Sequence, residues 1–326
     1  MTELYHPSIF DVQDYRQWLD YLNIEGYVVI GNVLSINERD AWKNGMFDML
    51  NYLHPNFNKI DRSTWINRNM PRSFGKAIQH ENGICQCKYV WELRTNPIIK
   101  EIFSRVHNTN DLVSSMDALS ISWSKKNKSK SWAHVDQNST IRGGELYSIQ
   151  GAYNYYPVEE FDRGFCAVPK SHHQYEETIR NFEEGGCLGD RHYLELSKIN
   201  LNPIMTKFLI PGNTFVLWNS KLIHANQNEI RDRPNDENDL PQLNRLTQYI
   251  TMMPREWRSE NDYRQKIKAC IEGKGTSHWA NMCDLKKPQR YSRSSQRLNN
   301  LESLPSVASI DDSNSLHIPE KIKNIL

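Results

Sequence analysis

The sequence lacks the features that mark several large classes of protein. Its longest apolar runs, such as Tyr27–Ile30 and Phe215–Trp218, are far too short to cross a bilayer, so no membrane span is expected. Basic and acidic residues nearly balance, at 40 against 39, which disfavours a dedicated nucleic-acid binder. The N-terminal segment has no basic stretch followed by an apolar one, so no secretory signal is expected and a cytoplasmic protein is predicted.

Cysteine is scarce as well, and its spacing is informative. Six cysteines are present, and no two of them form a CxxC pair. Cys85 and Cys87 stand one residue apart, and the others are scattered. Structural zinc sites use closely spaced cysteine pairs, and disulfides are rare in a reducing compartment. The sequence therefore predicts buried or idle thiols.

What the sequence does contain is enough for a large folded core. Of 326 residues, 38% are hydrophobic and 10% aromatic, which argues against wholesale disorder. We predict a single domain over 1–285, with a mainly helical part over 1–110, a β-rich core over about 115–255 and an extension over 256–285. Beyond it, the composition becomes rich in Ser, Asn and Arg. This predicts a polar, extended or partly disordered tail over 286–326, with a short helix near its end.

Helical patterns dominate the first part of the chain. Residues 12–24 carry apolar positions at helical spacing, with Asp11 placed to cap them. Ser35 and Glu38 form a capping box for a second helix, and Pro97 predicts the first turn of a third.

From Leu119 onward the hydrophobic period changes to two, as in strands. The expected strands cover 119–123, 146–156, 164–172, 204–210, 213–218 and 246–253. Glycine and proline separate several of them. Short strands that follow helices predict a mainly β fold with flanking helices, arranged as a sandwich or jelly roll.

His134 and Asp136 are separated by one residue in the stretch WAHVD. Residues i and i+2 of a strand project to the same side, so both side chains can bind one ion. The pattern alone is weak, because it occurs by chance in many proteins and a polar turn explains it as well.

A second histidine completes a donor set. His224 follows the apolar strand predicted over 213–218. Two imidazoles and one carboxylate can occupy one face of an octahedron and leave three positions open, as in non-haem Fe(II) oxygenases. Two open positions suit a bidentate 2-oxo acid, and the third suits O2. His134, Asp136 and His224 are therefore the candidate metal ligands and catalytic residues.

A keto acid with a distal carboxylate also needs a cationic anchor, and arginine offers two parallel hydrogen bonds to a carboxylate. Arg245 stands immediately before the strand predicted over 246–253 and is expected to point into the barrel. Arg231 and Arg233 lie nearer to His224 in sequence, but they fall in a polar loop typical of a surface. We prefer Arg245 as the anchor and keep the other two as alternatives.

The order of these segments resembles the phytanoyl-CoA dioxygenase (PhyH)-like family of Fe(II)/2-oxoglutarate-dependent oxygenases. Four stretches between roughly residues 10 and 255 carry the resemblance: EGYVVIGNVLS, WAHVD, IQGAYNYYPVEEFDRGFCAVPKSHH and IPGNTFVLWNSKLIHANQN. In the third, Gly164, Pro169, Ser171 and His172 match the family's glycine turn and its P-x-S-H ending. Each motif alone is unspecific, whereas their order and spacing are specific.

The resemblance implies a double-stranded β-helix (jelly-roll or cupin-like) core with iron at one mouth. It also implies hydroxylation of a substrate by O2, coupled to oxidative decarboxylation of 2-oxoglutarate to succinate and CO2. Carried over by position, His134, Asp136 and His224 are the iron ligands and Arg245 is the 2-oxoglutarate anchor. Gln150 is a weaker candidate for a cosubstrate or substrate contact, and an ordinary inward polar residue is the alternative.

Two departures from the family pattern are visible. A polar insertion separates His224 from Arg245, and the sequence after residue 255 has no counterpart. His172 is expected to hold the turn after its strand and not to bind a metal. Related halogenases replace the carboxylate ligand with a small residue, so Asp136 predicts hydroxylation.

Other functions remain open alongside the hydroxylase of a small organic molecule. A cupin-type dioxygenase or isomerase works without 2-oxoglutarate, and a non-catalytic jelly-roll module only binds. A hydroxylase of nucleic acid or protein is motivated by the lysine-rich segment that precedes the WAHVD stretch, with Lys125, Lys126, Lys128 and Lys130. The sequence identifies neither the substrate nor the oligomeric state.

Overall fold

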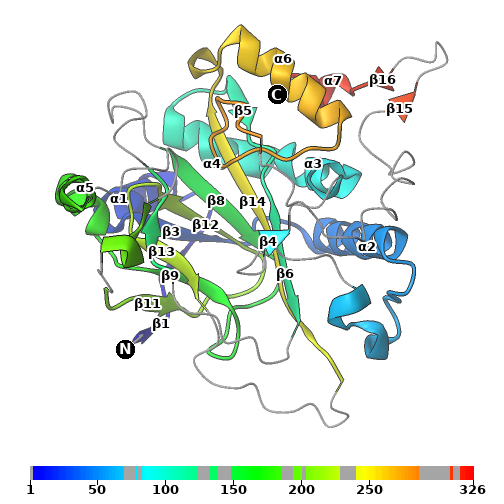
Figure 1. The fold of residues 1–326 in the computed structure, drawn as a ribbon, viewed down its shortest axis with the longest axis horizontal. Coiled ribbons are helices and arrows are strands. Elements are labelled where there is room, and N and C mark those ends of the chain that lie inside the picture. The colour runs from blue at the N-terminus through cyan, green and yellow to red at the C-terminus, as the bar shows by residue number, and fades with distance from the viewer. Residues whose placement is uncertain are drawn as a thin grey trace. The chain divides into compact units, whose positions relative to one another are not determined.

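The computed structural model describes residues 3–69, 78–79, 83–123, 132–137, 148–185, 194–199, 203–227, 240–285, 309–310 and 316–326 (Figure 1). The chain divides into two compact units built from interleaved segments. The first unit comprises Met1–Val33, Ser122–Asp236 and Leu243–Leu246. The second comprises Leu34–Ile121, Glu237–Gln242 and Thr247–Leu326.

The first unit contains a mixed six-stranded sheet in the order β1-β11-β9-β13-β7-β10. Its strands are β1 (Glu3–Tyr5), β11 (Thr206–Phe208), β9 (Gly164–Ala167), β13 (His224–Gln227), β7 (His134–Val135) and β10 (Leu194–Glu195). β1 runs parallel to β11, and the other pairs are antiparallel. Two of the short strands, β7 and β13, begin at the predicted histidines.

The first unit also contains part of a second sheet, with its strands in the order β2-β3-β12-β8-β14. Its strands are β2 (Ile9–Phe10), β3 (Tyr27–Gly31), β12 (Thr214–Asn219), β8 (Ile149–Asn154) and β14 (Leu243–Pro254), and β14 continues into the second unit. In register, Trp218 lies opposite Gln150 on one side and Tyr27 on the other. The inner strands are buried almost throughout, which matches the apolar sequences of β3 and β12, whereas β8 also buries Gln150 and Asn154.

Helices flank these sheets. α1 (Tyr15–Glu25) buries Trp18 and Leu22 and contacts β3, and α5 (Tyr175–Glu184) follows the 3₁₀ helix η5 (Ser171–Gln174). The predicted helix over 12–24 is confirmed, but Asp11 is not its cap, because the helix begins later, with Asp14 at the N-cap.

α1 ends at Gly26, which has a left-handed φ of 82° and donates its N–H to Leu22. A Cβ there would lie 2.5 Å from Nδ1 of His172, so glycine is required for the close approach as well as for the turn. His172 Nε2 hydrogen-bonds the carbonyl of Asn23 at 3.0 Å. The histidine therefore ties the turn after β9 to the end of α1, which confirms its predicted structural role.

The predicted strand over 164–172 is shorter than expected. β9 ends at Ala167, and Lys170 has a left-handed φ of 66° before η5 begins. Pro169 has no N–H to donate to a sheet, so the strand cannot continue through it. The other predicted strands are found within a few residues of their expected bounds, as β6, β8, β11, β12 and β14.

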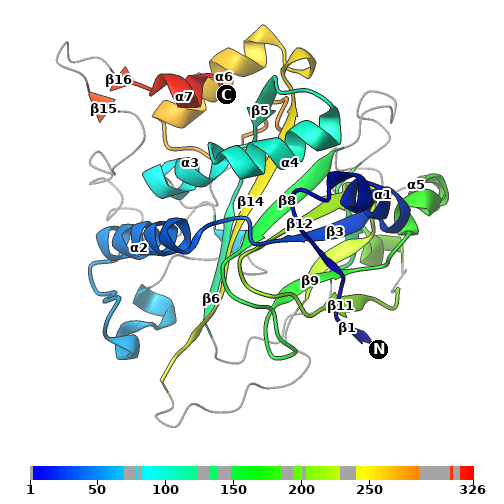
Figure 2. The same cartoon turned by 180° about the vertical axis from the view of Figure 1, so that it is seen from behind.

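The second unit has the remaining helices: α2 (Ile36–Leu53), α3 (Lys88–Arg94), α4 (Pro97–His107), α6 (Glu260–Ile271) and α7 (Glu320–Lys323). α3 lies against both α2 and α4 (Figure 2). The capping box of Ser35 and Glu38 opens α2, and Pro97 opens α4, as predicted. The strands are β4 (Ile78–Gln79), β5 (Leu112–Ser114), most of β6 (Leu119–Trp123), the rest of β14, and the pair β15 (Ser309–Ile310) and β16 (Leu316–His317).

The end of the chain is packed into this unit. Ile318, Ile322, Ile325 and Leu326 are buried in a cluster that also contains Trp91. The composition predicted an extended or partly disordered tail over 286–326, with a short terminal helix. The described end of that segment contains the helix, α7, and is folded. β15 and β16 also belong to this segment, and residues 286–308 and 311–315 lie outside the described residues.

The described part of the chain is therefore rich in sheet, with flanking helices, as the strand and helix patterns predicted. It contains no helix with the length and apolar character that a bilayer crossing requires. Its five cysteines are free thiols, and all are buried.

Candidate metal centre

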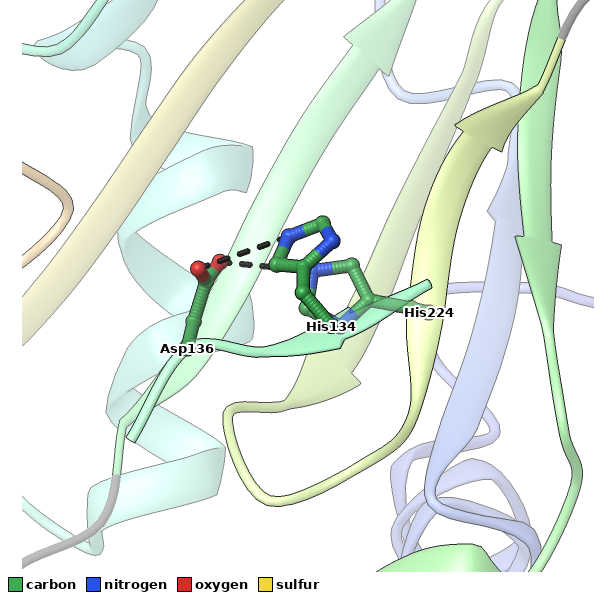
Figure 3. Close-up of side chains that lie close together, drawn as sticks. All are labelled: His134, Asp136 and His224. Atoms are coloured by element: carbon green, nitrogen blue, oxygen red, sulfur yellow. Dashed lines mark ion pairs between the residues drawn. The ribbon is translucent and has the colours of Figure 1, made fainter. Parts of the chain in front are cut away.

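Two neighbouring strands bring the predicted histidines together. β7 and β13 are antiparallel, and His134 lies directly opposite His224 in register. Directly opposed residues project from the same face of a sheet, so the two imidazoles meet, with ring centroids 4.2 Å apart. Asp136 follows β7 and turns its carboxylate toward both rings (Figure 3). Donor atoms of all three residues lie within 4.8 Å of one another.

The spacing of these donors fits one metal ion. His134 Nε2 is 3.4 Å from Asp136 Oδ1, and His224 Nε2 is 3.3 Å from Asp136 Oδ2. Two ligand atoms at a right angle, each about 2.1 Å from a metal, stand about 3.0 Å apart. The three donors therefore need only small shifts to bind an ion on one face.

Hydrogen bonds set the tautomers of both histidines. Nδ1 of His134 lies 2.9 Å from the carbonyl of Trp132, and Nδ1 of His224 lies 2.8 Å from that of Leu222. A carbonyl only accepts, so Nδ1 donates in both rings and Nε2 is the atom that faces the carboxylate. Burial, helped by the neighbouring His224, lowers the pKa of His134 to about 4. This imidazole is therefore neutral at physiological pH, as a metal ligand must be.

Asp136 is held by groups that sequence reasoning did not select for this role. Gln150 Nε2 donates to Asp136 Oδ2 at 3.0 Å, so the structure places Gln150 on a predicted metal ligand. The backbone N–H of Asp136 donates to the carbonyl of Ser220 at 2.9 Å. Ser220 Oγ donates to Gln137 Oε1 at 2.6 Å and accepts the N–H of Ser148 at 3.0 Å. This network joins the Asp136 loop to the turn before His224.

The sequence carried no signal for this network, because Ser220 and Gln137 are 83 residues apart and belong to no motif. Both are fully buried, at 0% exposure. Buried polar groups that bond one another at such a separation become visible only in the fold.

Aromatic rings surround the histidines. Trp132 stacks on His134 with centroids 4.1 Å apart and planes 7° apart. Trp218 lies 5.6 Å and Phe165 6.4 Å from the ring of His224, and these two rings are 5.4 Å from each other. Such a lining limits water around the donors and strengthens their electrostatic interactions.

Arg245 belongs to the same unit as the metal centre and lies at the start of β14. It is 4% exposed and donates from Nη1 to the carbonyl of Arg163 at 3.0 Å. The carbonyl of its neighbour Leu246 accepts the N–H of Tyr155 at 3.0 Å. Tyr155 is five residues beyond Gln150, which corresponds to about 16 Å along a strand. An arginine side chain and an extended five-carbon diacid together can bridge such a gap.

The structure thus brings His134, Asp136, His224 and Gln150 into contact and places Arg245 apart from them. The alternative anchors Arg231 and Arg233 lie outside the described residues. The lysine-rich segment with Lys125, Lys126, Lys128 and Lys130 also lies outside them.

Comparisons with known proteins give distant similarities. No family model matches the chain. Ava biosynthesis cluster protein O from Aspergillus versicolor is 26% identical over 274 residues, covering 80% of this chain and 84% of that protein.

Two solved structures share the fold at low sequence identity. GlcNAc Inducible Gene 2 (GIG2) of Candida albicans matches with a TM-score of 0.52 and 14% identity, over 82% of this chain and 70% of that one. The non-haem α-ketoglutarate-dependent carbocyclase SnoK from nogalamycin biosynthesis matches with a TM-score of 0.50 and 14% identity, over 74% of this chain and 84% of that one.

Proposed function

We propose that this chain is an Fe(II)/2-oxoglutarate-dependent oxygenase that hydroxylates a small organic substrate in a jelly-roll core. The observation that carries the proposal is the convergence of His134, Asp136 and His224, whose donor atoms lie within 4.8 Å of one another. Two imidazoles and one carboxylate on one side of an ion leave the other side open, which is the preferred arrangement of non-haem Fe(II) enzymes.

The protein's own groups keep this site ready. The carbonyls of Trp132 and Leu222 orient the two imidazoles, and Gln150 orients the carboxylate of Asp136. Groups that orient metal ligands commonly change metal affinity by about 10–100-fold when removed. The site is thus organised before an ion binds.

Arg245 is the proposed anchor for the cosubstrate. Its guanidinium is buried at the start of β14 and oriented by the carbonyl of Arg163, and a buried guanidinium binds a carboxylate through two parallel bonds. Iron and 2-oxoglutarate supply the oxidation when bound: one oxygen atom of O2 enters succinate as CO2 leaves, and the other hydroxylates the substrate.

A small organic substrate is supported by the relative from Aspergillus versicolor, whose name places it in a biosynthesis cluster. SnoK, which shares the fold, is described as a carbocyclase from nogalamycin biosynthesis. Retention of the carboxylate ligand Asp136 favours hydroxylation over halogenation. The free thiols of the described cysteines suit a reducing, cytoplasmic compartment.

The experiment is turnover of 2-oxoglutarate by the purified full chain. With Fe(II), O2 and 2-oxoglutarate, we expect slow succinate formation even without the substrate, and faster formation when a panel of candidate small molecules includes the substrate. Removal of Fe(II) with a chelator should stop it. Oxygen consumption by the Fe(II) form that is independent of 2-oxoglutarate would instead identify a cupin-type dioxygenase and contradict the proposal.

A further inference from the structure

Two buried polar side chains beside the metal centre have no hydrogen-bond partner. The indole Nε1 of Trp218 makes no hydrogen bond, and neither Oδ1 nor Nδ2 of Asn226 makes one. Trp218 is 4% exposed and Asn226 is 7% exposed. Nearly all buried polar groups in native proteins are paired, so such exceptions need a cause. A ligand that binds at this position supplies one.

Both side chains lie on the face that carries the metal donors. Trp218 is the register partner of Gln150, whose amide binds Asp136, and directly paired residues share a face. Its ring centroid is 5.6 Å from that of His224. Asn226 is two residues after His224 on β13, so its side chain projects to the same side.

Phe165 joins the two groups. It is the register partner of Asn226 and its ring is 5.4 Å from that of Trp218. On β9, Ala167 lies opposite His224 and Phe165 lies opposite Asn226. Arg163 directly precedes β9, and its carbonyl accepts a hydrogen bond from Arg245. The unpaired groups therefore lie on the side of His224 that leads toward Arg245.

We propose that the indole N–H of Trp218 donates a hydrogen bond to a carboxylate oxygen of the 2-oxo-acid cosubstrate, with the amide of Asn226 as its neighbouring contact. An indole can only donate, so its partner must be rich in acceptors, and a dicarboxylate between the metal donors and Arg245 meets this condition. The inference rests on the proposed function and adds two residues to the cosubstrate site.

This assignment has a thermodynamic signature. An unpaired buried donor destabilises the ligand-free protein, because it has lost its hydration without gaining a partner. Removing the donor should therefore cost the ligand-free protein only the lost ring contacts, and should weaken the complex in addition. If the indole N–H has a purely structural role, its removal should destabilise the ligand-free protein and leave 2-oxoglutarate binding unchanged.

The test compares two tryptophan variants of the full chain. Binding of 2-oxoglutarate is measured by calorimetry on the Ni(II)-loaded protein, which does not turn over, and thermal unfolding is measured without metal. Trp218→Phe should weaken 2-oxoglutarate binding about tenfold, or about 1.4 kcal/mol, with no change in Ni(II) affinity and with a smaller fall in melting temperature than the same change at a buried tryptophan whose indole is hydrogen-bonded.

Trp18→Phe is the matched control. Trp18 is fully buried in α1 of the same unit, and its Nε1 donates to the carbonyl of Val12 at 3.2 Å. Its loss should lower the melting temperature and leave 2-oxoglutarate affinity unchanged. Asn226→Leu, which keeps the side-chain volume, should behave like Trp218→Phe.

The outcomes separate this inference from the proposed function. If the wild-type Ni(II) form does not bind 2-oxoglutarate, the proposed function is wrong and the inference falls with it. If the wild type binds and Trp218→Phe binds equally well, only the assignment of Trp218 is overturned. Weaker binding together with a fall in melting temperature as large as that of Trp18→Phe would make the indole a structural group and would also overturn it.

Discussion

Both compact units bury ionisable side chains, but those side chains contact different kinds of partner. In the second unit, Arg94 is fully buried and ends on two backbone carbonyls, those of Cys85 at 2.7 Å and Asp117 at 2.9 Å. Burial lowers its pKa to about 10, so it stays charged at physiological pH. Lys266 in α6 is buried in the same way, also between carbonyls.

In the first unit Lys207 likewise ends on backbone carbonyls, those of Glu160 and Asp162, but three ionisable side chains of that unit face one another. His134 and His224 use Nδ1 for backbone carbonyls and turn Nε2 toward the carboxylate of Asp136. A buried cation that donates to backbone carbonyls stabilises the fold, whereas donor atoms that converge on one point can bind a ligand. The kind of partner, more than burial itself, separates structural groups from candidate functional ones.

The largest expected effect concerns the three converging residues. His134→Ala, Asp136→Ala and His224→Ala should each lower metal affinity by more than about 100-fold, since removal of groups that only orient ligands already costs about 10–100-fold. The melting temperature of the metal-free protein should change little. Calorimetric metal titration and thermal unfolding measure both quantities. A variant that retained wild-type metal affinity would remove its residue from the ligand set.

The next effect compares two buried arginines, Arg245 and Arg94. Arg245→Ala should weaken 2-oxoglutarate by about 2–5 kcal/mol, the cost of removing one partner of a buried charged pair. Arg94→Met should leave that affinity unchanged and lower the free energy of unfolding by about 3 kcal/mol, because it strands two carbonyls. Calorimetry and urea unfolding of both variants separate the roles.

Arg231→Ala and Arg233→Ala serve as controls for the anchor and should change little. If one of them weakened 2-oxoglutarate and Arg245→Ala did not, the polar insertion would carry the anchor.

The last effect concerns Lys266 and is spread over several pH units. Burial lowers the pKa of Lys266 to about 7 from its ordinary value of 10.5. Between these values the unfolded chain binds the proton and the folded protein releases it, so stability rises with pH by up to about 1.4 kcal/mol per unit. Relative to Lys266→Met, the wild type should gain stability from pH 7 to 10. Equal pH profiles in urea unfolding would contradict the lowered pKa.

The sequence predicted the features that depend on short spacing. The i and i+2 separation of His134 and Asp136 implied a shared side of the chain, and the Ser35 and Glu38 box opens α2 as expected. Pro169 is a local signal of the same kind: it has no N–H for a sheet, and the strand that we expected to reach residue 172 ends at Ala167. Such features follow from backbone geometry within a few residues.

The packed end of the chain shows where composition misleads. Residues 286–326 are polar on average, yet Ile318, Ile322, Ile325 and Leu326 repeat at nearly helical spacing and are buried. The spacing of these four apolar residues predicts a packed helix, but the average composition of the segment is dominated by its polar residues.

The sequence by itself determined which residue types could bind a metal and in what local order they occur: a His-x-Asp pair, and a later histidine that follows an apolar strand pattern. Only the tertiary structure decided that His134 and His224 lie in register, that Gln150 and Ser220 hold Asp136, and that Trp218 and Asn226 remain unpaired beside them. Strand order and register join residues that are many tens of positions apart. No local propensity encodes that pairing, because it depends on the burial of whole sheet faces.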